Sequence, residues 1–387
     1  MRKVIMVFIF LGLVSLFADV TYEGARSVLG AYIKILEGSA LIAGAVTIGE
    51  FLGYLMRFVS GFLADKFKSS KTLWFFTITG YVINLIAVPA LAIAGSWEVA
   101  LALVFLERIG KGLRAPTRDV ILSEVAEGIG RGKGFGLHEV MDQIGAFAGP
   151  VLVGWSIATS GGDYRPAFLT LAIPATLSLL FLGMSAYMYP TVKSVNVKKS
   201  TVGWVSNAKF TLFIVSLSLM TAGYLPWSIV SYHMKATQII SDAEIGFAYA
   251  LAMGVDALVA FPAGFLYDVV GPKSLILTPV AAALIPITLF TNSRLSFYIA
   301  AALWGVVMGI YETNMRAAIP DLVPEDKRAL AYGVYGLVYG AAWMAGGLIM
   351  GYIYVVDLTY LITYALILEI LSLGFLTALI RKYTIKT

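Results

Sequence analysis

The stretch LERIGKGLRAPTRDVILSEVAEG, residues 106–128, carries the feature on which the interpretation of the whole chain depends. Four of its charged residues are spaced so that a helix presents all of them on one face, namely Glu107, Lys111, Arg114 and Arg118. The stretch is too apolar for a soluble loop and too charged for an ordinary membrane span. In a membrane, charges on one stripe must face a watery cavity or one another.

The next stretch, RGKGFGLHEVMDQIGAFAGP at residues 131–150, continues this centre with His138, Glu139, Asp142, Gly145, Gly149 and Pro150. Glycines at this spacing let a helix approach a neighbour closely, and a proline bends it. The order His-Glu-x-x-Asp superficially resembles a zinc-binding helix. The second histidine of such a helix is missing, and the only other histidine, His233, lies about a hundred residues away, so we expect no zinc hydrolase.

The composition is that of a polytopic membrane protein. Of the 387 residues, 59% are hydrophobic and 13% are charged, against about 25% charged residues in soluble domains. Apolar runs of roughly 20 residues recur from end to end. The chain has no cysteine, which excludes disulfides and thiolate metal sites. The apolar start, residues 4–18, runs without a small-residue cleavage site into a continuing helical pattern, so we expect a retained first span.

Hydropathy and helix breakers predict an all-α fold of twelve transmembrane helices in two six-helix halves. The predicted spans are 4–36, 40–65, 72–94, 97–124, 133–159, 166–189, 209–236, 243–268, 273–291, 295–322, 329–355 and 358–381. The predicted domains are an N-terminal bundle at 1–189, a cytoplasmic linker at 190–208 and a C-terminal bundle at 209–387. Lys and Arg are concentrated in the loops and span ends on the side of the membrane where the N-terminus lies. This bias predicts that both termini are cytoplasmic in a multi-pass protein of the plasma membrane.

The two halves resemble each other in sequence. GFLADKFKSSK at 61–71 matches GFLYDVVGPKS at 264–274, and residues 131–136 match residues 328–333. A parallel duplication implies a pseudo-two-fold axis along the membrane normal, with a substrate site between the halves.

Over nearly its whole length the chain resembles the major facilitator superfamily. The motifs that carry the resemblance are Gly61-x-x-x-Asp65-Lys66, its weaker copy Gly264-x-x-x-Asp268, Arg108-x-x-Lys111-Gly112 and Gly145-x-x-x-Gly149-Pro150-x-x-x-Gly154. The resemblance implies the twelve-helix fold and secondary transport. It assigns Arg108 to proton coupling with an acid, and it associates the last motif with antiporters.

A narrower resemblance rests on FADVTYEGARS at 17–27, GKGLRAPTRD at 110–119 and GFGLHEVMDQIGA at 134–146. These segments are similar to a prokaryotic branch of largely uncharacterised exporters, loosely tied to drug or metal efflux. That likeness indicates export from the cell but does not identify a substrate.

Coupling to protons is predicted from acids that face cations inside the membrane. A single charge at mid-membrane costs at least ~2.5–3.5 kcal/mol, so charges on one helical face are expected to point into the protein. The predicted coupling residues are Asp19, Glu23, Arg108, Glu139 and Asp142, with His138 as a possible proton relay. The alternative is a structural ion-pair network between the first and fourth spans.

Two further groups of residues are predicted to contact substrate or to close the pathway. The substrate-contact candidates are Arg26, Glu50, Glu107, Lys111, Arg114, Asp256 and Tyr311. The gate candidates are Arg57, Gly61, Asp65, Lys66, Arg118, Asp119 and Asp268. Structural pairing is the alternative for many of them. In the second half, aromatic residues are expected to line a cavity, and Gly223 with Pro226 predicts a break in the seventh span.

The function predicted from the sequence is a secondary active transporter that works by alternating access. No phosphate-binding loop motif is present, so we expect no cofactor and a proton gradient as the energy source. Proton antiport with export of a small organic compound is the first hypothesis, and export of an organic anion or a divalent metal is the alternative. A membrane enzyme or a non-transporting receptor is a weaker hypothesis. We expect a monomer in the lipid bilayer and no nucleic-acid partner.

Overall fold

The structure is a computed structural model that describes residues 2–67, 69–192 and 207–384. Nearly all of these residues are helical, and none of them forms a strand. The predicted all-α class is therefore confirmed.

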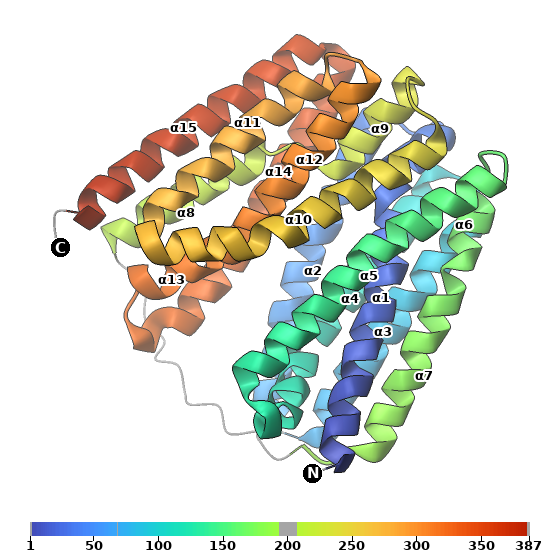
Figure 1. Cartoon of the computed structure of the whole chain (residues 1–387), viewed down its shortest axis with the longest axis vertical. Helices are drawn as coiled ribbons and strands as arrows, with labels where there is room; N and C mark the ends of the chain where they lie inside the picture. The colour runs from blue at the N-terminus through green and yellow to red at the C-terminus, as the bar shows by residue number, and fades with distance from the viewer. Residues whose placement is uncertain (1, 68, 193–206, 385–387) are drawn as a thin grey trace. The chain divides into compact units, whose positions relative to one another are not determined.

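The first half of the chain forms seven α-helices and two short 3₁₀ turns, shown from blue to green in Figure 1. They are α1 (Arg2–Ile35), α2 (Ala40–Phe67), α3 (Ser70–Ala90), η1 (Leu91–Ile93), α4 (Trp97–Val125), η2 (Glu127–Ile129), α5 (Arg131–Thr159), α6 (Tyr164–Thr170) and α7 (Ala172–Met188). The short helix α6 is followed almost directly by α7, and the two together match one predicted span.

The second half continues from yellow-green to red in Figure 1. Its elements are α8 (Ala208–Gly223), α9 (Trp227–Thr237), α10 (Asp242–Val270), η3 (Gly271–Ile276), α11 (Leu277–Leu289), α12 (Arg294–Ile310), η4 (Tyr311–Met315), α13 (Arg316–Leu322), η5 (Glu325–Lys327), α14 (Arg328–Val356) and α15 (Leu358–Thr384). The element η4 is a π-helical turn that joins α12 to α13. A single π turn within a helix often marks a functional position.

Ten helical segments among the described residues are long and apolar enough to cross a membrane, against the twelve predicted. The helix α4 is not one of the ten, because its charged residues interrupt the apolar run. Residues 242–289 count as a single run of 48 residues, where two spans were predicted. Helix length and apolar composition alone therefore do not reproduce the predicted number of twelve membrane spans.

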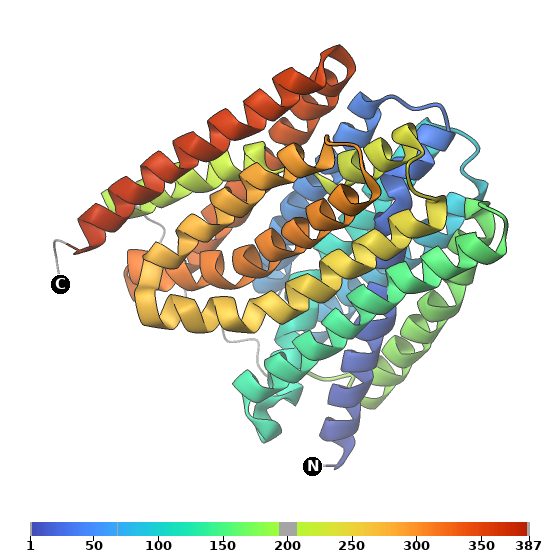
Figure 2. The same cartoon turned by 45° about the horizontal axis from the view of Figure 1, so that its top comes forward.

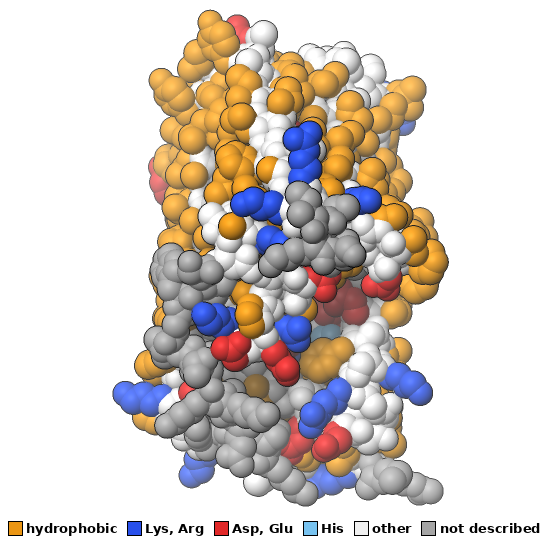
Figure 3. Space-filling view, turned by 90° about the vertical axis from the view of Figure 1, so that its left-hand side faces the viewer, with side chains coloured by type: hydrophobic (Ala, Val, Ile, Leu, Met, Phe, Trp, Pro, Cys, Tyr) orange, Lys and Arg blue, Asp and Glu red, His pale blue; other side chains and the backbone are white. Residues whose placement is uncertain are grey.

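Large hydrophobic side chains are exposed on the helices, as expected for a protein whose outer surface contacts lipid. Phe58, Phe62, Phe261, Phe265 and Ile93 are among the most exposed of them. On the face drawn in Figure 3, hydrophobic side chains cover much of the upper part, and charged side chains gather in the lower half. The protein is therefore a multi-pass membrane protein, and its predicted orientation stays a prediction.

The chain forms two compact units. The first unit comprises Met1–Glu37, Leu52–Lys198 and Ser241–Ala250, and the second comprises Gly38–Phe51, Lys199–Ile240 and Leu251–Thr387. The start of α2 thus groups with the second unit, and the start of α10 groups with the first. The predicted domains 1–189 and 209–387 stay a prediction, and most of the predicted linker 190–208 lies outside the described residues.

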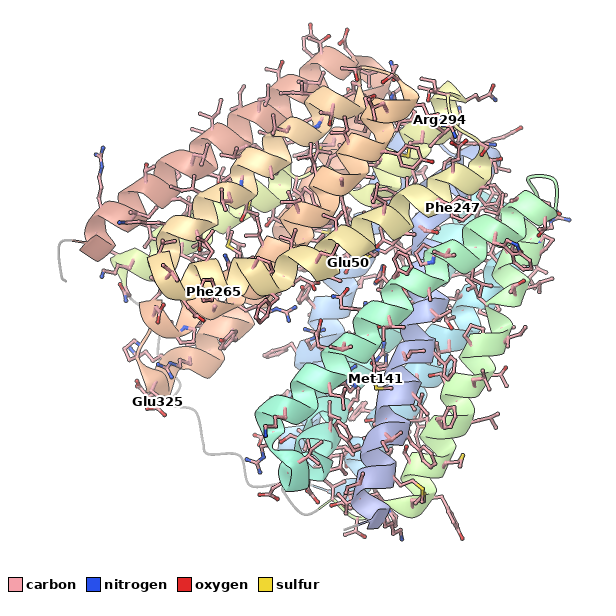
Figure 4. All side chains as sticks on the ribbon, viewed as in Figure 1. Glu50, Met141, Phe247, Phe265, Arg294 and Glu325 are labelled. Atoms are coloured by element: carbon pink, nitrogen blue, oxygen red, sulfur yellow. The ribbon has the colours of Figure 1, made fainter. Side chains whose placement is uncertain are left out.

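In the first unit, α1 runs along α5, and the views in Figures 1 and 2 agree on this. A Cβ on Gly145 would lie 2.9 Å from the Cβ of Asp19, and one on Gly149 would lie 2.9 Å from the backbone nitrogen of Gly24. The predicted close approach of this glycine helix to a neighbour is thus confirmed. Met141, labelled on α5 in Figure 4, occupies the space beside another glycine of α1.

In the second unit, α8 packs along α15 and α14. The seventh span is broken as predicted, because α8 ends at Gly223 and α9 begins at Trp227. The side chain of Trp304 on α12 holds the break, since its Nε1 donates a hydrogen bond of 3.1 Å to the carbonyl of Leu225. The hydroxyl of Tyr224 in turn donates to the carbonyl of Trp304 at 3.0 Å.

We predict that Gly149→Ala destabilises the protein, because the added methyl group meets the backbone of α1 and forces the two helices apart. Overpacking of this kind costs about 1–3 kcal/mol. The control is Gly183→Ala on α7, where a Cβ meets nothing within 4 Å. That change is expected to be neutral or to stabilise, since alanine favours a helix over glycine. Melting temperatures in detergent measure both, and equal effects of the two variants would contradict the packing argument.

Candidate functional site

Glu23 is the centre of a charged cluster in the first unit. Its Oε1 lies 3.2 Å from Arg26 Nη1, one turn along α1, and 3.8 Å from Lys111 Nζ on α4. Its Oε2 accepts a hydrogen bond of 2.6 Å from the hydroxyl of Tyr249, which lies at the start of α10 and belongs to the same unit. The Glu23 side chain is almost wholly buried. The carboxylate is therefore held from three helices, and two cations compensate its charge.

Asp19 lies one turn before Glu23 on the same face of α1 and is 5% exposed. Its Oδ1 is buried and has no hydrogen-bond partner among the described residues. Four charged groups lie within electrostatic range of it, namely Asp142, Lys111, Arg114 and Glu23. Asp19 is thus a buried carboxyl that has both acids and cations within electrostatic range.

Asp142, on α5, is the acid that faces Asp19. Its Oδ2 lies 3.3 Å from Nδ1 of His138, one turn before it on the same helix. His138 is buried, and its Nε2 has no hydrogen-bond partner among the described residues. His138 and Asp142 therefore lie within ion-pair distance on this helix, and the role of His138 as a proton relay stays a prediction.

Glu107 and Arg108 form a second buried ion pair, on α4. Arg108 Nε lies 3.1 Å from Glu107 Oε2, and both residues are less than a tenth exposed. Asn84 on α3 donates from Nδ2 to Glu107 Oε1 at 2.7 Å and also to the Glu107 carbonyl at 3.1 Å. The Glu107 carboxylate is thus fixed from two helices, which ties α3 to α4.

Lys111 and Arg114 lie against aromatic rings. Lys111 Nζ is 3.9 Å from the centre of the Tyr22 ring, and the guanidinium carbon of Arg114 is 4.1 Å from the centre of the Tyr81 ring. Arg114 is 2% exposed, and its Nε has no hydrogen-bond partner among the described residues. No carboxylate among those residues forms an ion pair with Arg114. The rings of Tyr22 and Tyr81 therefore stabilise a buried cation.

A small cavity opens within the first unit between α1, α3, η1 and α4. Arg26, Glu107 and Arg108 line its polar side, and Tyr22, Leu29, Ala87, Val88, Leu91 and Val104 are among its other lining residues. Three of the predicted site residues therefore meet at one hollow, although they come from two different helices.

The gate candidates divide into two groups. Arg118 and Asp119 form an ion pair, with Arg118 Nη2 at 2.7 Å from Asp119 Oδ1, and Arg118 also donates to Ser15 Oγ on α1 at 3.2 Å. Gly61 of α2 lies beside Pro116 of α4, because a Cβ there would be 3.7 Å from the proline Cβ. Through these contacts α4 is joined to α1 at Ser15 and to α2 at Gly61, within the first unit.

The remaining gate candidates lie nearer the surface. Arg57 is exposed, and its guanidinium carbon is 5.5 Å from the centre of the Tyr54 ring. Asp65 and Lys66 are exposed near the end of α2, and Asp268 is exposed near the end of α10. Their predicted role in a gate stays a prediction.

Three coupling or substrate candidates are either exposed or belong to the second unit. Glu139 is exposed on α5, in contrast to its neighbour His138. Glu50, labelled on α2 in Figure 4, is partly buried and belongs to the second unit. Asp256 on α10 is buried and packs against α12, since a Cβ on Gly309 would lie 3.2 Å from its Oδ1.

The second unit contains a continuous set of aromatic side chains in contact, which we call the aromatic wall. Its members are Phe213, Tyr335, Tyr311, Tyr339, Trp343, Tyr224, Trp304 and Trp227. Neighbouring ring centres are 4.7 to 6.5 Å apart, with Tyr311 and Tyr339 the closest at 4.7 Å. Tyr311 begins the π turn η4, so the irregular part of the tenth span is placed within this wall.

Several side chains of the cluster could not be chosen from the sequence. Tyr249 is 226 residues from Glu23, and Asn84 is 23 residues from Glu107. Neither residue carries a charge that would single it out. Glu369 was also missed, although a lone acid in an apolar span is a recognisable signal. It lies on α15 and is wholly buried.

Among the residues that the structure describes, no group of three or more His, Asp or Glu side chains is arranged to hold a metal ion. The four acids considered for a divalent metal, Asp19, Glu23, Glu139 and Asp142, do not form such a group.

Comparison with known proteins places the chain in a family. The sequence model of the Major Facilitator Superfamily matches residues 8–211 and 212–384. An uncharacterised protein of Mycobacterium bovis is 36% identical over 376 residues, which are 95% of this chain and 91% of that protein. An uncharacterised MFS-type transporter of Methanocaldococcus jannaschii is 26% identical over 373 residues, covering 94% and 92% of the two chains.

The fold is similar to that of solved transporters. The crystal structure of the nucleoside transporter NupG aligns with a TM-score of 0.73, covering 97% of this chain and 98% of that chain at 16% sequence identity. At this identity the likeness concerns the fold alone.

We predict that Glu107→Gln strongly destabilises the protein, because it removes the carboxylate that forms an ion pair with the buried Arg108. Removing one partner of a buried pair costs about 3–5 kcal/mol. The double variant Glu107→Gln with Arg108→Met is expected to regain part of that loss, since the stranded charge is gone. The matched control is Glu127→Gln, which breaks the exposed pair with Arg131 and should cost about 0–1 kcal/mol. A double variant no more stable than the single one would contradict this account.

Proposed function

Because the chain belongs to the major facilitator superfamily, we propose that it is a proton-coupled transporter that exports a small organic compound in exchange for protons. The observation that carries the proposal is the buried carboxyl of Asp19, which lacks a hydrogen bond on Oδ1 and lies near both an acid and two cations. A carboxyl in such a place can exist with or without its proton, depending on what occupies the site around it.

Asp19 and Glu23 have different partners, and this difference supports a division of roles. Glu23 is held by Arg26, Lys111 and Tyr249, so its charge is compensated. Asp19 has no such ion pair among the described residues. A proton that enters the cluster is therefore taken up by Asp19 in preference to Glu23. Uptake cancels one negative charge and weakens the attraction that Asp19 exerts on Lys111.

The fold supports transport by alternating access, in which a site opens to one side of the membrane and then to the other. The broken span at Gly223–Pro226 and the π turn Tyr311–Met315 are places where helices of the second unit can bend. The close glycine packing of α5 on α1 keeps those two helices together as one body while others move.

Export, as opposed to import, is proposed from the sequence motif Gly145 to Gly154, which resembles the antiporter signature of the superfamily. We propose that both termini are cytoplasmic and that the proton gradient across the plasma membrane supplies the energy without a cofactor. The cargo leaves chemically unchanged, so the protein acts as a carrier rather than as an enzyme.

The proposed cargo is a small amphipathic compound with an aromatic part. The aromatic wall of the second unit offers ring faces for stacking, and Tyr311 and Tyr339 are its most closely spaced pair. The acids of the first unit independently offer charge to a basic group. The aromatic wall is the reason for proposing an aromatic cargo, and the acids are the reason for proposing that the cargo is a cation.

The proposal is tested with purified protein in liposomes, with ethidium as an aromatic cationic probe. We predict that an imposed pH gradient drives ethidium movement, and that Asp19→Asn reduces this flux at least tenfold because the site can no longer exchange a proton. The control is Glu98→Gln, an exposed acid in the first turn of α4, which should transport normally. A pH gradient that moves no probe, or an Asp19→Asn variant that is still driven by it, would contradict proton coupling.

An organic anion is the second candidate cargo, and Arg114 is the observation that favours it. This buried cation lies against two tyrosine rings and forms no ion pair with a carboxylate among the described residues. A carboxylate or phosphate on a ligand could pair with its guanidinium through two parallel hydrogen bonds.

We predict opposite behaviour of two probes if the cargo is an anion. Benzoate should raise the melting temperature of the purified protein, ethidium should not, and Arg114→Lys should abolish the effect of benzoate because lysine lacks the planar fork. The control is Arg131→Lys, an exposed residue of α5 far along the chain from this site. If ethidium stabilises the protein and benzoate does not, the cationic cargo is supported and the anion is rejected.

A further inference from the structure

Glu369 is a carboxyl of the second unit that none of the predicted sets of site residues includes. It lies in α15, and its side chain is 0% exposed. Neither of its two oxygens has a hydrogen-bond partner among the described residues, and none of those residues forms an ion pair with it. An ionised carboxyl without a partner in such surroundings is costly, so the group is expected to hold a proton.

The position of Glu369 connects it to the broken seventh span. Its Oε1 lies 3.0 Å from the place where a Cβ on Gly223 would be, and Gly223 is the last residue of α8. Any side chain at Gly223 would therefore press on the carboxyl. Two turns further from the break, Ser216 of α8 and Ser372 of α15 hydrogen-bond each other at 2.8 Å, which fixes the register of the two helices.

The end of α8 is short of hydrogen-bond partners in its own right. Pro226 has no N–H, so the carbonyl of Ala222 cannot receive the bond that a continuous helix would provide. Thr221, on the same turn, is 1% exposed, and its hydroxyl has no partner among the described residues. Water that enters this break would find several polar groups that lack bonds.

The charged residues on the elements packed against Glu369 are all placed away from it or otherwise engaged. On α8 the only one is Lys209, 14 residues before Gly223 and so about 20 Å along the helix. Lys273 of η3 and Arg381 and Lys382 of α15 are exposed, while Arg328 of α14 donates to the carbonyl of Pro320. The helix α11 carries no ionisable residue.

The other titratable groups on these elements are tyrosines. They are Tyr224 at the break, Tyr332, Tyr335, Tyr339, Tyr352 and Tyr354 on α14, and Tyr360 and Tyr364 on α15. A tyrosine hydroxyl keeps its proton far above neutral pH and offers no compensating charge. Nothing on these elements therefore favours the ionised form of Glu369 over the protonated one.

We propose that Glu369 is a proton-binding site of the second unit, which holds its proton while α8 is packed on α15 and releases it when the break at Gly223–Pro226 opens to water. On release, the O–H bond of the carboxyl breaks, the proton passes to a water molecule, and the carboxylate remains. Its use in transport rests on the proposed proton coupling, and it would add a proton to those exchanged at Asp19.

The proton on Glu369 is measured directly by infrared spectroscopy of the protein in liposomes, without any substrate. At neutral pH the wild type should show a C=O stretching band from a protonated carboxyl that is absent from Glu369→Gln. The control Glu98→Gln should keep the band, since that acid is exposed on α4 and lies in the other unit. Identical spectra of wild type and Glu369→Gln would overturn the proposal. The glutamine is isosteric with the neutral acid, so the variant should keep the melting temperature of the wild type.

The role in coupling is measured with ethidium in the same liposomes. Glu369→Gln should lower movement driven by a pH gradient roughly tenfold or more, while exchange of ethidium at equal pH on both sides continues at the wild-type rate. If the wild type itself responds to no pH gradient, proton-coupled export fails, and the infrared band still decides whether Glu369 binds a proton. If the wild type is driven and Glu369→Gln is driven equally well, the coupling role of Glu369 alone is overturned.

Discussion

The constraint on which this structure depends is that a charge inside a membrane protein must be met by another charge, a dipole or a proton. In the first unit, Glu23 meets two cations and the hydroxyl of Tyr249, and Glu107 meets Arg108 and Asn84. Because these groups share their neighbours, a change of charge at one of them alters the balance at the others. The charged stripe of α4 is therefore a network rather than a row of separate sites.

The features that could be predicted from the sequence are those set by local chemistry. Apolar run lengths gave span limits close to the observed helices, and Gly223 with Pro226 marked the break because a proline cannot donate the bond that continues a helix. The close approach at Gly145 followed from the absence of a side chain. The number of spans was less secure, since α4 owes its place in the bundle to packing and ion pairs rather than to apolar composition.

Side-chain partnerships were largely out of reach, because they depend on tertiary packing. Tyr249 and Glu23 meet across 226 residues, and no periodicity in either segment anticipates the contact. Glu139 was grouped with Asp142 on a sequence argument, yet it is exposed while His138 beside it is buried. Adjacent residues of a helix point about 100° apart, so a shift of one position separates a side chain that enters the cluster from one that leaves it.

The two units satisfy the same constraint in different ways, and this difference bears on how they can act together. The first unit surrounds Glu23 with cations, an arrangement that favours the charged form. The second unit buries Glu369 without a hydrogen bond or an ion pair to any described residue, an arrangement that favours the neutral form. The protonation of an acid that is paired with cations changes when a ligand displaces those cations. The protonation of an acid without cations changes when water reaches it. A carrier that contains both kinds has one element sensitive to cargo and another sensitive to the opening of a helix break.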